Sequence, residues 1–443
     1  MITVRGVKGL HLKISGAPSL ETIKLGRPEH VGSVPFKIPF IKPKLLVSTG
    51  DHVKIGTPLF HDKKNQDLKF VSPGCGTISD IVFGPRRVIE KIIIRLDSNE
   101  EYEKFDRLNK NDLQTLSKKN LTDLLLQSGM WPLIKELPFR GIADPDTTPA
   151  AIWVNLDTCE PFLPAPEVYL AGKKKLFDFG LRALEKLSDK VNISASGNGN
   201  YDIPLTHKYS GQYPSGDPGV LLYHTRRSSN ENRCWYISGQ DLLLISTFLT
   251  SGTYPVERIV SVGGCMADSV EKKHCITRTG VPIAHLAPRS SKKQNIRFLA
   301  GGLFKGYAVH CDSFLGLYET SLNVIDQGDR EEFLGFLRPG FNKPSFSRTF
   351  LSSINTKDLE IDSGIHGEIR ACVNCGACAK ICPVEILPQF TFKCLAANEI
   401  EEALEHGLLD CVECGLCSFV CPSKIELNGT FREAKQEYRK EQS

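Results

Sequence analysis

Eight cysteines near the C-terminal end constrain the fold and chemistry of this chain more than any other feature. They occur in two runs with the same spacing, and each run is followed by proline. The first run is Cys372, Cys375, Cys378 and Cys382, and the second is Cys411, Cys414, Cys417 and Cys421. This spacing is typical of proteins with two [4Fe–4S] clusters, in which the fourth cysteine of each run ligates the other cluster.

The pattern therefore predicts two ligand sets that exchange one cysteine. Cluster I is assigned Cys372, Cys375, Cys378 and Cys421, and cluster II is assigned Cys411, Cys414, Cys417 and Cys382. A zinc site needs only four ligands per ion and leaves the repeated spacing unexplained. Disulfides are not expected, because the N-terminus lacks the apolar segment of a secretory signal. We expect a chain that handles electrons.

Charge balance and hydropathy argue against a nucleic-acid-binding protein and against a membrane-spanning one. The 443 residues suffice for roughly three or four domains. The 55 basic and 51 acidic residues are too balanced to indicate nucleic acid as the main partner. No stretch approaches the roughly 18 to 20 apolar residues that span a bilayer, so we expect no transmembrane segment.

The first half of the chain predicts a β unit followed by an α/β unit. Residues 44–96 hold short apolar runs between turn signals, which resemble the barrel-sandwich hybrid of lipoyl and biotinyl carriers. Lys63 falls near the hairpin that carries the modified lysine there, although an unmodified scaffold fits Lys64 and Asn65 better. Leucines from Leu113 to Leu125 predict a helix that ends at Gly129.

Between residues 150 and 250, β-type and helical patterns alternate, which predicts an α/β layer with a largely parallel sheet. The β-type runs are Ala151–Leu156 and Gly219–Tyr223, and the helical ones are Lys174–Leu187 and Gln240–Leu249. Residues 256–345 favour a small mixed β domain. A helix with Leu395, Ile400 and Leu404 on one face is expected between the cysteine runs, ending at Gly407.

Several stretches resemble NqrA, a subunit of the sodium-translocating NADH:quinone oxidoreductase. They lie between residues 2 and 352 and read ITVRGVKGLHLKISGAP, HDKKNQDLKFVSPGCGTISDI, LLQSGMWPLIKELPF, APEVYLAG, SGQYPSGDPG and LGFLRPGFNKPSFSRTFL. The cysteine region instead resembles the double-cluster domain of RnfC, a subunit of the Rnf complex, which is a ferredoxin:NAD oxidoreductase. Its matching stretches are ACVNCGACAKICPVEILPQ and DCVECGLCSFVCPSKIEL.

This chain differs from RnfC at the loop that binds flavin in RnfC. RnfC holds flavin mononucleotide (FMN) in a glycine-rich loop, where this chain has Gln127-Ser-Gly-Met-Trp-Pro132. Without consecutive glycines the backbone cannot close around the ring and phosphate, and Trp131 adds bulk. Residues 155–161 (NLDTCEP) and 213–216 (YPSG) keep some Rnf-type character, but Asp217-Pro218 does not. We therefore predict no FMN site and no NADH site.

The resemblance implies a multidomain α/β plus β fold. Its parts are a barrel-sandwich hybrid, a Rossmann-like α/β domain, an SLBB-type β-grasp domain and an α-helical bacterial-ferredoxin-like domain. We place these parts, in that order, at residues 1–105, 106–252, 253–365 and 366–432, followed by a polar tail at 433–443.

The resemblance also implies a function. The chain is expected to be a peripheral subunit on the cytoplasmic face of the inner membrane, in an NADH:quinone oxidoreductase that transports sodium. Its two [4Fe–4S] clusters would relay single electrons, and the isolated chain would not catalyse hydride transfer. Expected partners are membrane-embedded and flavin-carrying subunits of the complex. Quinone, such as ubiquinone, is a candidate ligand that no residue can be assigned to.

Two alternatives stay open at this point. One is a working RnfC-type protein that binds FMN and NADH and passes electrons through its clusters; it requires flavin in the purified protein. The other is a docking or assembly subunit in which the clusters only hold the C-terminal fold together.

Overall fold

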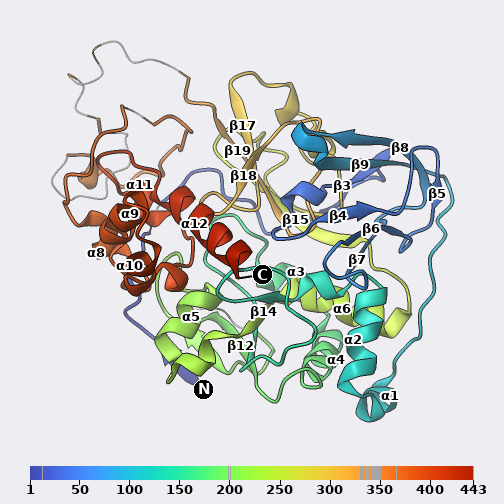
Figure 1. Cartoon of the computed structure of the whole chain (residues 1–443). Helices are drawn as coiled ribbons and strands as arrows, with labels where there is room; N and C mark the ends of the chain where they lie inside the picture. The colour runs from blue at the N-terminus through green and yellow to red at the C-terminus, as the bar shows by residue number, and fades with distance from the viewer. Residues whose placement is uncertain are drawn as a thin grey trace.

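The computed structural model describes residues 1–442 except 12, 198, 200, 330–333, 335, 336, 338, 339, 342–350 and 366. Most of the LGFLRPGFNKPSFSRTFL stretch therefore lies outside the described residues. Four units are arranged around the centre of Figure 1. The N-terminal β unit (blue) and the C-terminal cysteine unit, residues 367–441 (red), lie on opposite sides, with the α/β unit (green) and the second β unit (yellow to gold) between them.

The N-terminal β unit consists of two antiparallel sheets packed face to face. The four-stranded sheet has the order β3 (His30–Ser33), β9 (Ile89–Leu96), β8 (Gly76–Phe83), β5 (His52–Val53). The three-stranded sheet has the order β4 (Pro43–Leu45), β6 (Pro58–Asp62), β7 (Lys69–Val71). Alternate residues such as Ile92 and Ile94 are buried between the sheets, as the two-residue period of a strand requires. The predicted small β unit is confirmed, and Lys63 lies in the exposed hairpin after β6.

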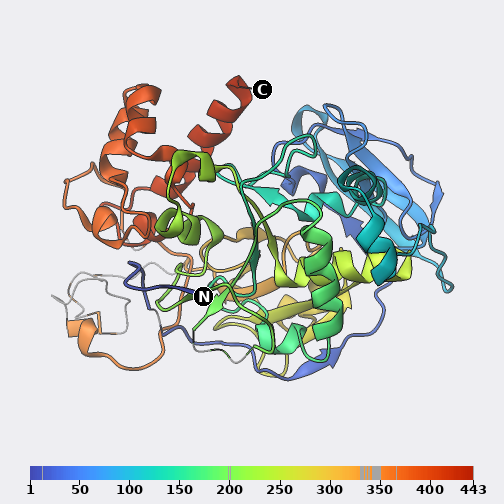
Figure 2. The same cartoon turned by 90° about the horizontal axis from the view of Figure 1, so that it is seen from below.

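The α/β unit is built on a six-stranded sheet whose first five strands are parallel. Its order is β1 (Ile2–Val4), β13 (His207–Tyr209), β12 (Val191–Ser196), β11 (Ile152–Asn155), β14 (Trp235–Ser238) and antiparallel β10 (Lys135–Glu136). Its helices are α1 (Lys110–Thr115), α2 (Lys118–Gln127), α3 (Pro166–Tyr169), α4 (Lys174–Leu184), α5 (Pro218–Thr225) and α6 (Gly239–Ser251). The predicted largely parallel sheet is confirmed. Helices α4 and α6 pack together, whereas α5 faces the cysteine unit (Figures 1 and 2).

Two local predictions in this unit are wrong. Residues 219–223, predicted as a strand, lie in α5, because the Asp217 side chain caps the helix and Pro218 occupies its first turn. The leucines predicted to share one helix lie on two, α1 and α2, because the Ser117 hydroxyl accepts from Asn120 N and starts a second helix.

The second β unit is a mixed six-stranded sheet, as predicted for this region. Its order is β18 (Tyr307–Val309), β17 (Ile296–Ala300), β19 (Ser321–Asp326), β15 (Glu257–Gly263), β16 (His274–Arg278), β2 (Thr22–Lys24), and α7 (Ile283–Leu286) packs beside it. The N-terminal segment thus adds β1 to the α/β sheet and β2 to this one. The predicted unit 1–105 therefore contributes strands to the sheets of all three of these units.

The cysteine unit is helical. It contains α8 (Ala377–Ile381), α9 (Pro388–Ala396), α10 (Ile400–Glu405), α11 (Leu416–Phe419) and α12 (Leu427–Glu441). The single helix predicted between the cysteine runs is two helices, α9 and α10, separated at Asn398, whose φ is +61°. The predicted tail at 433–443 is mostly α12, because Phe431, Ala434 and Lys435 bury one face of that helix.

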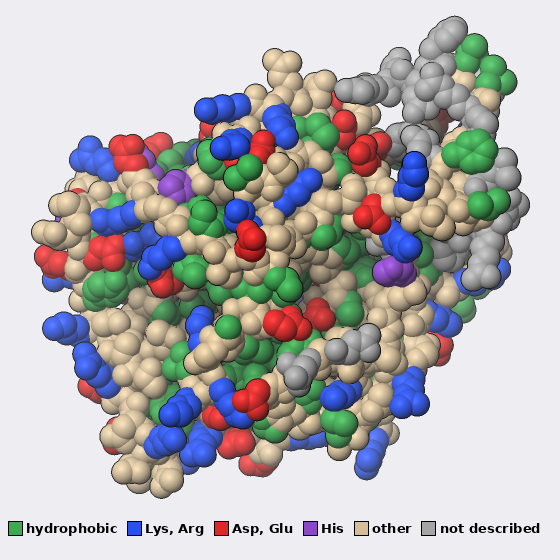
Figure 3. Space-filling model, turned by 180° about the vertical axis from the view of Figure 1, so that it is seen from behind, with side chains coloured by type: hydrophobic (Ala, Val, Ile, Leu, Met, Phe, Trp, Pro, Cys, Tyr) green, Lys and Arg blue, Asp and Glu red, His purple; other side chains and the backbone are tan. Residues whose placement is uncertain are grey.

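Short 3-10 turns connect these elements: η1 (Pro35–Lys37), η2 (Pro85–Arg87), η3 (Trp131–Leu133), η4 (Ser229–Asn232), η5 (Ser290–Lys292), η7 (Leu351–Ile354) and η8 (Leu408–Asp410). None of the helices in the described part of the chain is long and apolar enough to span a bilayer. On the face shown in Figure 3, basic and acidic side chains are interspersed, in line with the balanced composition.

A buried ion pair joins the α/β unit to the second β unit. The Arg258 guanidinium on β15 donates to the Asp241 carboxylate on α6, and both side chains are buried. We expect Asp241→Asn to lower the free energy of unfolding by about 3–5 kcal/mol, because the Arg258 charge stays buried without its partner. Urea unfolding measures the change.

The exposed pair between Lys24 and Glu257 provides the control, since Glu257→Gln should cost less than about 1 kcal/mol. Equal losses in the two variants would contradict the expected role of the buried pair.

Candidate iron–sulfur site

The two cysteine runs follow the same backbone course. Left-handed φ values between +53° and +77° recur at three pairs of equivalent positions: Asn374 and Glu413, Gly376 and Gly415, Glu385 and Lys424. Each glycine directly precedes a short helix, α8 or α11. Glycine adopts such φ values without steric cost, which suits Gly376 and Gly415 to the turns before the two helices. The repeat in the sequence is therefore also a repeat in structure.

The cysteines assigned to cluster I lie around one cavity. Cys372, Cys375, Cys378 and Cys421 line a space of about 360 Å³, which includes its opening to solvent. The rest of the lining is mostly apolar and includes Ile425 and Leu427, and Cys375 is exposed. The structure thus brings together the four thiols that the sequence groups, although Cys421 is far from the others in the chain.

The cysteines assigned to cluster II also lie near one another, at a more buried position. Burial raises the pKa of Cys417 well above its usual value, and the neighbouring Cys411, Cys414 and Cys382 raise it further. Burial likewise raises the pKa of Cys382 and Cys414 to about 12. These thiols must lose their protons to bind a metal.

The eight sulfur atoms, all in the described part of the chain, do not form a compact group of the kind that a single zinc ion needs. Tetrahedral zinc has Zn–S bonds of about 2.3 Å, which place its sulfurs about 3.8 Å apart. Among the described residues, no three of these eight cysteines bring their sulfur atoms within 4.8 Å of one another. The eight thiols are therefore not arranged as a single-ion zinc site.

Lys435 on α12 ties the second cysteine run to the α/β unit. Its side chain is only 2 % exposed, and its ammonium donates to Cys411 O (3.0 Å), Pro138 O (2.9 Å) and Glu413 Oε1 (2.8 Å). Burial raises the pKa of Glu413, but Lys435 and Arg140 overcome this and hold the pKa below its usual value. One charged group therefore joins three segments of the chain.

An aromatic contact lies beside the same run. The Tyr213 hydroxyl donates to Cys414 O at 2.8 Å, and its ring stacks on Phe304 at a centroid distance of 4.7 Å. Phe304 in turn meets the Phe419 ring on α11 edge-on at 5.7 Å. The α/β unit and the second β unit thus both contact the second cysteine run.

Near these rings, Asp217 is held by two cations. Its carboxylate accepts from Arg140 Nη2 at 2.7 Å and from the Lys305 ammonium. Burial raises the pKa of Asp217, but the two cations outweigh it and hold the pKa well below its usual value. Lys305 also lies close enough to Cys414 to lower the pKa of that thiol, although burial dominates there.

Further polar contacts complete the docking of the cysteine unit. Arg226 forms two hydrogen bonds with Asp410, of 2.7 and 3.0 Å, and His224 Nε2 donates to Pro383 O at 2.8 Å. At the far end of α12, Arg439 donates to Glu136 at 2.7 Å and covers the ring of Phe40 at 4.2 Å. The cysteine unit is therefore fastened at several points along its length.

The loops compared with a flavin site have other contacts in this structure. Trp131 is fully buried, donates to Ala143 O at 2.8 Å and packs edge-on against Trp235. In the NLDTCEP segment, Asn155 Nδ2 donates to Ser194 Oγ and to Gly216 O. The NLDTCEP and YPSG segments therefore pack on each other and, through Tyr213, on the cysteine unit.

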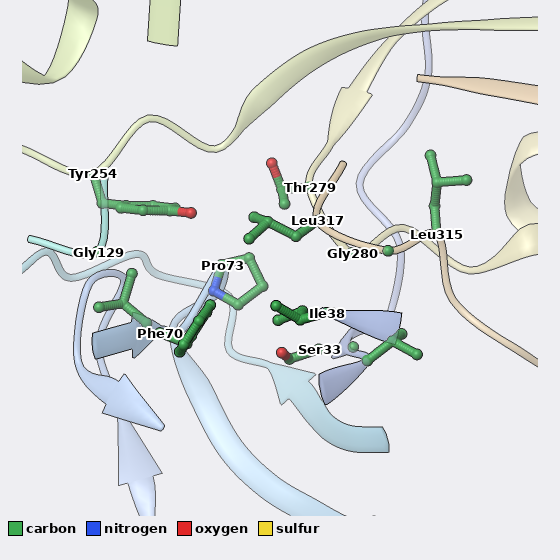
Figure 4. A pocket seen from close by; sticks show the side chains of 14 residues that line it. Ser33, Ile38, Phe70, Pro73, Gly129, Tyr254, Thr279, Gly280, Leu315 and Leu317 are labelled. Atoms are coloured by element: carbon green, nitrogen blue, oxygen red, sulfur yellow. The ribbon is translucent and has the colours of Figure 1, made fainter. Parts of the chain in front are cut away.

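A separate apolar pocket lies where the N-terminal β unit, the α/β unit and the second β unit meet (Figure 4). It encloses about 460 Å³ including its opening, and none of its lining residues is charged or a cysteine. The labelled side chains of Phe70, Pro73, Tyr254 and Leu317 surround it.

Sequence reasoning missed the residues that dock the cysteine unit. Lys435 and Pro138 are 297 positions apart, and Tyr213 and Cys414 are 201 apart. Nothing local marks Lys435, which lies in a segment rich in charged residues. The only available signal was the departure of the YPSGDP loop from the Rnf-type pattern.

Comparison with known proteins agrees with this division of the chain. Family models described as the NqrA N-terminal barrel-sandwich hybrid domain and the NqrA second alpha/beta domain match residues 2–97 and 116–254. A model described as a 4Fe-4S dicluster domain matches residues 370–425. These matches confirm the resemblances and the barrel-sandwich, α/β and cluster-type parts of the predicted fold.

Relatives match along nearly the whole chain. The NqrA protein of the Na(+)-translocating NADH-quinone reductase of Pseudomonas aeruginosa is 32 % identical over 410 residues, 91 % of each chain. The protein of the same name from Histophilus somni is 31 % identical, and the match covers 92 % of each chain. The one from Rhodopirellula baltica is also 31 % identical, and the match covers 91 % of this chain and 90 % of that one. A NAD+-reducing [NiFe]-hydrogenase structure reaches a TM-score of only 0.33 at 12 % identity, over 50 % of this chain and 51 % of that one. That likeness supports no argument.

The contacts of Lys435 predict the effect of removing its charge. Lys435→Met should destabilise the cysteine unit by about 3 kcal/mol, because the Glu413 carboxylate and two carbonyls lose a charged donor in a buried place. Hydrogen exchange of the α12 amides measures this loss.

Glu437→Gln, at an exposed position of the same helix, is the control and should change exchange little. If Lys435→Met left α12 as protected as the control does, the central role of Lys435 would be refuted.

Proposed function

Because the chain belongs to the NqrA family of the Na(+)-translocating NADH-quinone reductase, we propose that it is a peripheral subunit of such a complex and carries electrons. The observation that supports electron transfer is the pair of cysteine sets, the first of which lines a single cavity. Sodium transport belongs to membrane-spanning partners, and this chain docks on them and on flavin-carrying subunits from the cytoplasmic face of the membrane.

In this proposal the chain holds two [4Fe–4S] clusters, each of which exchanges one electron at a time when bound. Cys372, Cys375, Cys378 and Cys421 hold cluster I, and Cys411, Cys414, Cys417 and Cys382 hold cluster II. The cavity lined by the first set and the match to a dicluster domain support this assignment.

Several basic side chains lie near the thiols assigned to cluster II. Lys435 and Arg140 lower the pKa of the Cys411 thiol while Glu413 raises it, Lys305 lowers the pKa of Cys414, and Lys8 lowers the pKa of Cys382. By contrast, no basic side chain is among the groups that shift the pKa of Cys378 in the first set. We propose that these cations favour the reduced state of cluster II, because reduction adds a negative charge beside them.

The isolated chain does not catalyse hydride transfer in this proposal. The buried Trp131 and the packed loops around Asn155 support the absence of FMN and NADH sites. Quinone, such as ubiquinone, stays a candidate ligand without assigned residues.

We also propose that the α/β unit is Rossmann-like and that the second β unit is an SLBB-type β-grasp domain. The parallel sheet with its helices supports the first assignment, and the mixed sheet supports the second. We propose domain boundaries at 1–105, 106–252, 253–365 and 366–432. Strands β1 and β2 of the first range pair with the sheets of the second and third ranges.

Replacing one cluster ligand tests the cysteine assignment. We expect Cys414→Ser to lower the iron content of anaerobically purified protein from about eight to about four atoms per chain. One of two electron paramagnetic resonance signals should disappear, while hydrogen exchange in residues 1–365 stays unchanged.

Cys394→Ser is the matched control, because Cys394 lies in the same unit on α9 and is not a predicted ligand. Loss of iron in Cys394→Ser, or full iron in Cys414→Ser, would contradict the assignment.

Removing a cation tests the electrostatic proposal. Lys305→Met should lower the midpoint potential of one cluster by roughly 40–100 mV, as a unit charge several Å away contributes about 1–2 kcal/mol. Asp217 keeps its bond to Arg140, so the fold should persist.

A redox titration followed by electron paramagnetic resonance measures both potentials. Lys293→Met, at an exposed position in the same unit, is the control and should shift neither midpoint potential. A Lys305→Met protein with wild-type potentials would rule out this role for the cation.

A further inference from the structure

Three metal-ligating side chains meet at one end of the N-terminal β unit, away from the eight cysteines. They are His52 on β5, Cys75 just before β8 and Asp97 just after β9. One ligand atom of each lies within 4.8 Å of the other two, and His52 Nε2 is 2.7 Å from Asp97 Oδ2. The strands β5, β8 and β9 lie together at the outer edge of the molecule (Figure 1).

The backbone holds the three residues in place. β5 pairs with β8 through His52 and Thr77, and β8 pairs with β9 along its length. Asp97 N donates to Cys75 O at 3.0 Å, which joins the other two segments. Gly76 permits this close approach, because a Cβ there would clash with the backbone of Arg95. The group therefore sits on paired strands and not on a loose loop.

One side of the group is buried and the other is open. Cys75 is 1 % exposed, whereas the side chains of His52 and Asp97 are 52 % and 43 % exposed. An ion can therefore reach the group from solvent and keep a water molecule as a further ligand. Close by, Lys54 is paired with Glu101 at 2.9 Å, so its positive charge is largely offset.

An imidazole nitrogen, a thiolate and a carboxylate are the ligand types that suit zinc. We propose that His52, Cys75 and Asp97 bind one zinc ion, with water at the fourth position. The Cys75 thiol loses its proton to solvent, and the hydrogen bond between His52 and Asp97 gives way to bonds with the ion. Zinc bonds of about 2.0–2.3 Å require ligand atoms about 3.3–3.8 Å apart. The 2.7 Å separation of His52 and Asp97 therefore widens by roughly 0.6 Å, and the Cys75 sulfur approaches from at most 4.8 Å.

The position suggests what the ion would do. The chain leaves the N-terminal β unit just after Asp97. This segment pairs with Ile55, two residues after β5: Ile55 N donates to Glu101 O at 2.9 Å and Glu103 N donates to Ile55 O at 2.8 Å. An ion bound to both His52 and Asp97 clamps the start of this connection onto β5. The site is therefore structural and independent of the proposed clusters.

A second group of the same residue types provides a matched control. His310, Cys311 and Asp312 also place their ligand atoms within 4.8 Å, but they are consecutive in one segment. The side chains of His310 and Asp312 are 76 % and 78 % exposed, so fixing them around an ion would cost conformational entropy.

Zinc titration of the full-length, iron-loaded protein under anaerobic conditions tests the site, with iron and zinc counted after gel filtration. We expect one tightly held zinc per chain without loss of iron, and binding weakened about 100-fold by Cys75→Ser. His52→Asn, at a half-exposed position that tolerates substitution, should weaken binding similarly. Cys311→Ser should bind zinc as the wild type does.

Several outcomes would overturn the proposal. The wild type could retain no zinc, or it could take up zinc only with an equal loss of iron. The His52→Asn or Cys75→Ser protein could bind zinc as the wild type does, or Cys311→Ser could lose it.

Discussion

The arrangement of the molecule depends on the buried ammonium of Lys435. This ammonium donates to the carbonyls of Cys411 and Pro138 and to the Glu413 carboxylate. No other charged group among the described residues links the second cysteine run to the α/β unit in this way. A buried charge is costly unless its hydrogen bonds are made, so moving the cysteine unit away from the α/β unit would cost the ammonium its bond to Pro138. Two further ion pairs, Arg226–Asp410 and Arg439–Glu136, also join the cysteine unit to the α/β unit.

This position gives the YPSGDP loop a role different from that of the loop it resembles. Tyr213 donates to Cys414 O, and Asp217 caps α5 while it gathers Arg140 and Lys305 beside the second cysteine run. Tyr213, which keeps the Rnf-type pattern, contacts the cysteine unit, and Asp217, which departs from it, holds Arg140 and Lys305 nearby. In the proposed function, the chain holds clusters but no flavin, and electrons enter and leave it through neighbouring subunits.

Sequence patterns predicted what depends on local spacing. The cysteine runs determine which thiols come together, and the β and α/β units follow from residue periodicity. Residues 219–223 were mispredicted because a local apolar run fits a strand or a helix equally well until the Asp217 cap is considered. Lys435 is 297 positions from Pro138, and Tyr213 is 201 from Cys414. The N-terminal strands likewise pair with distant sheets. Such contacts leave no periodic signal in one sequence.

The central claim is that one chain with the NqrA fold carries two cubane clusters. Mössbauer spectroscopy of iron-57-labelled protein, purified anaerobically and combined with sulfide analysis, tests it most directly. We expect about eight iron atoms and eight sulfides per chain, all with the parameters of [4Fe–4S] clusters, half of them in each of two sites. Protein that holds zinc in these cysteines, or only one cluster per chain at full occupancy, would contradict the claim.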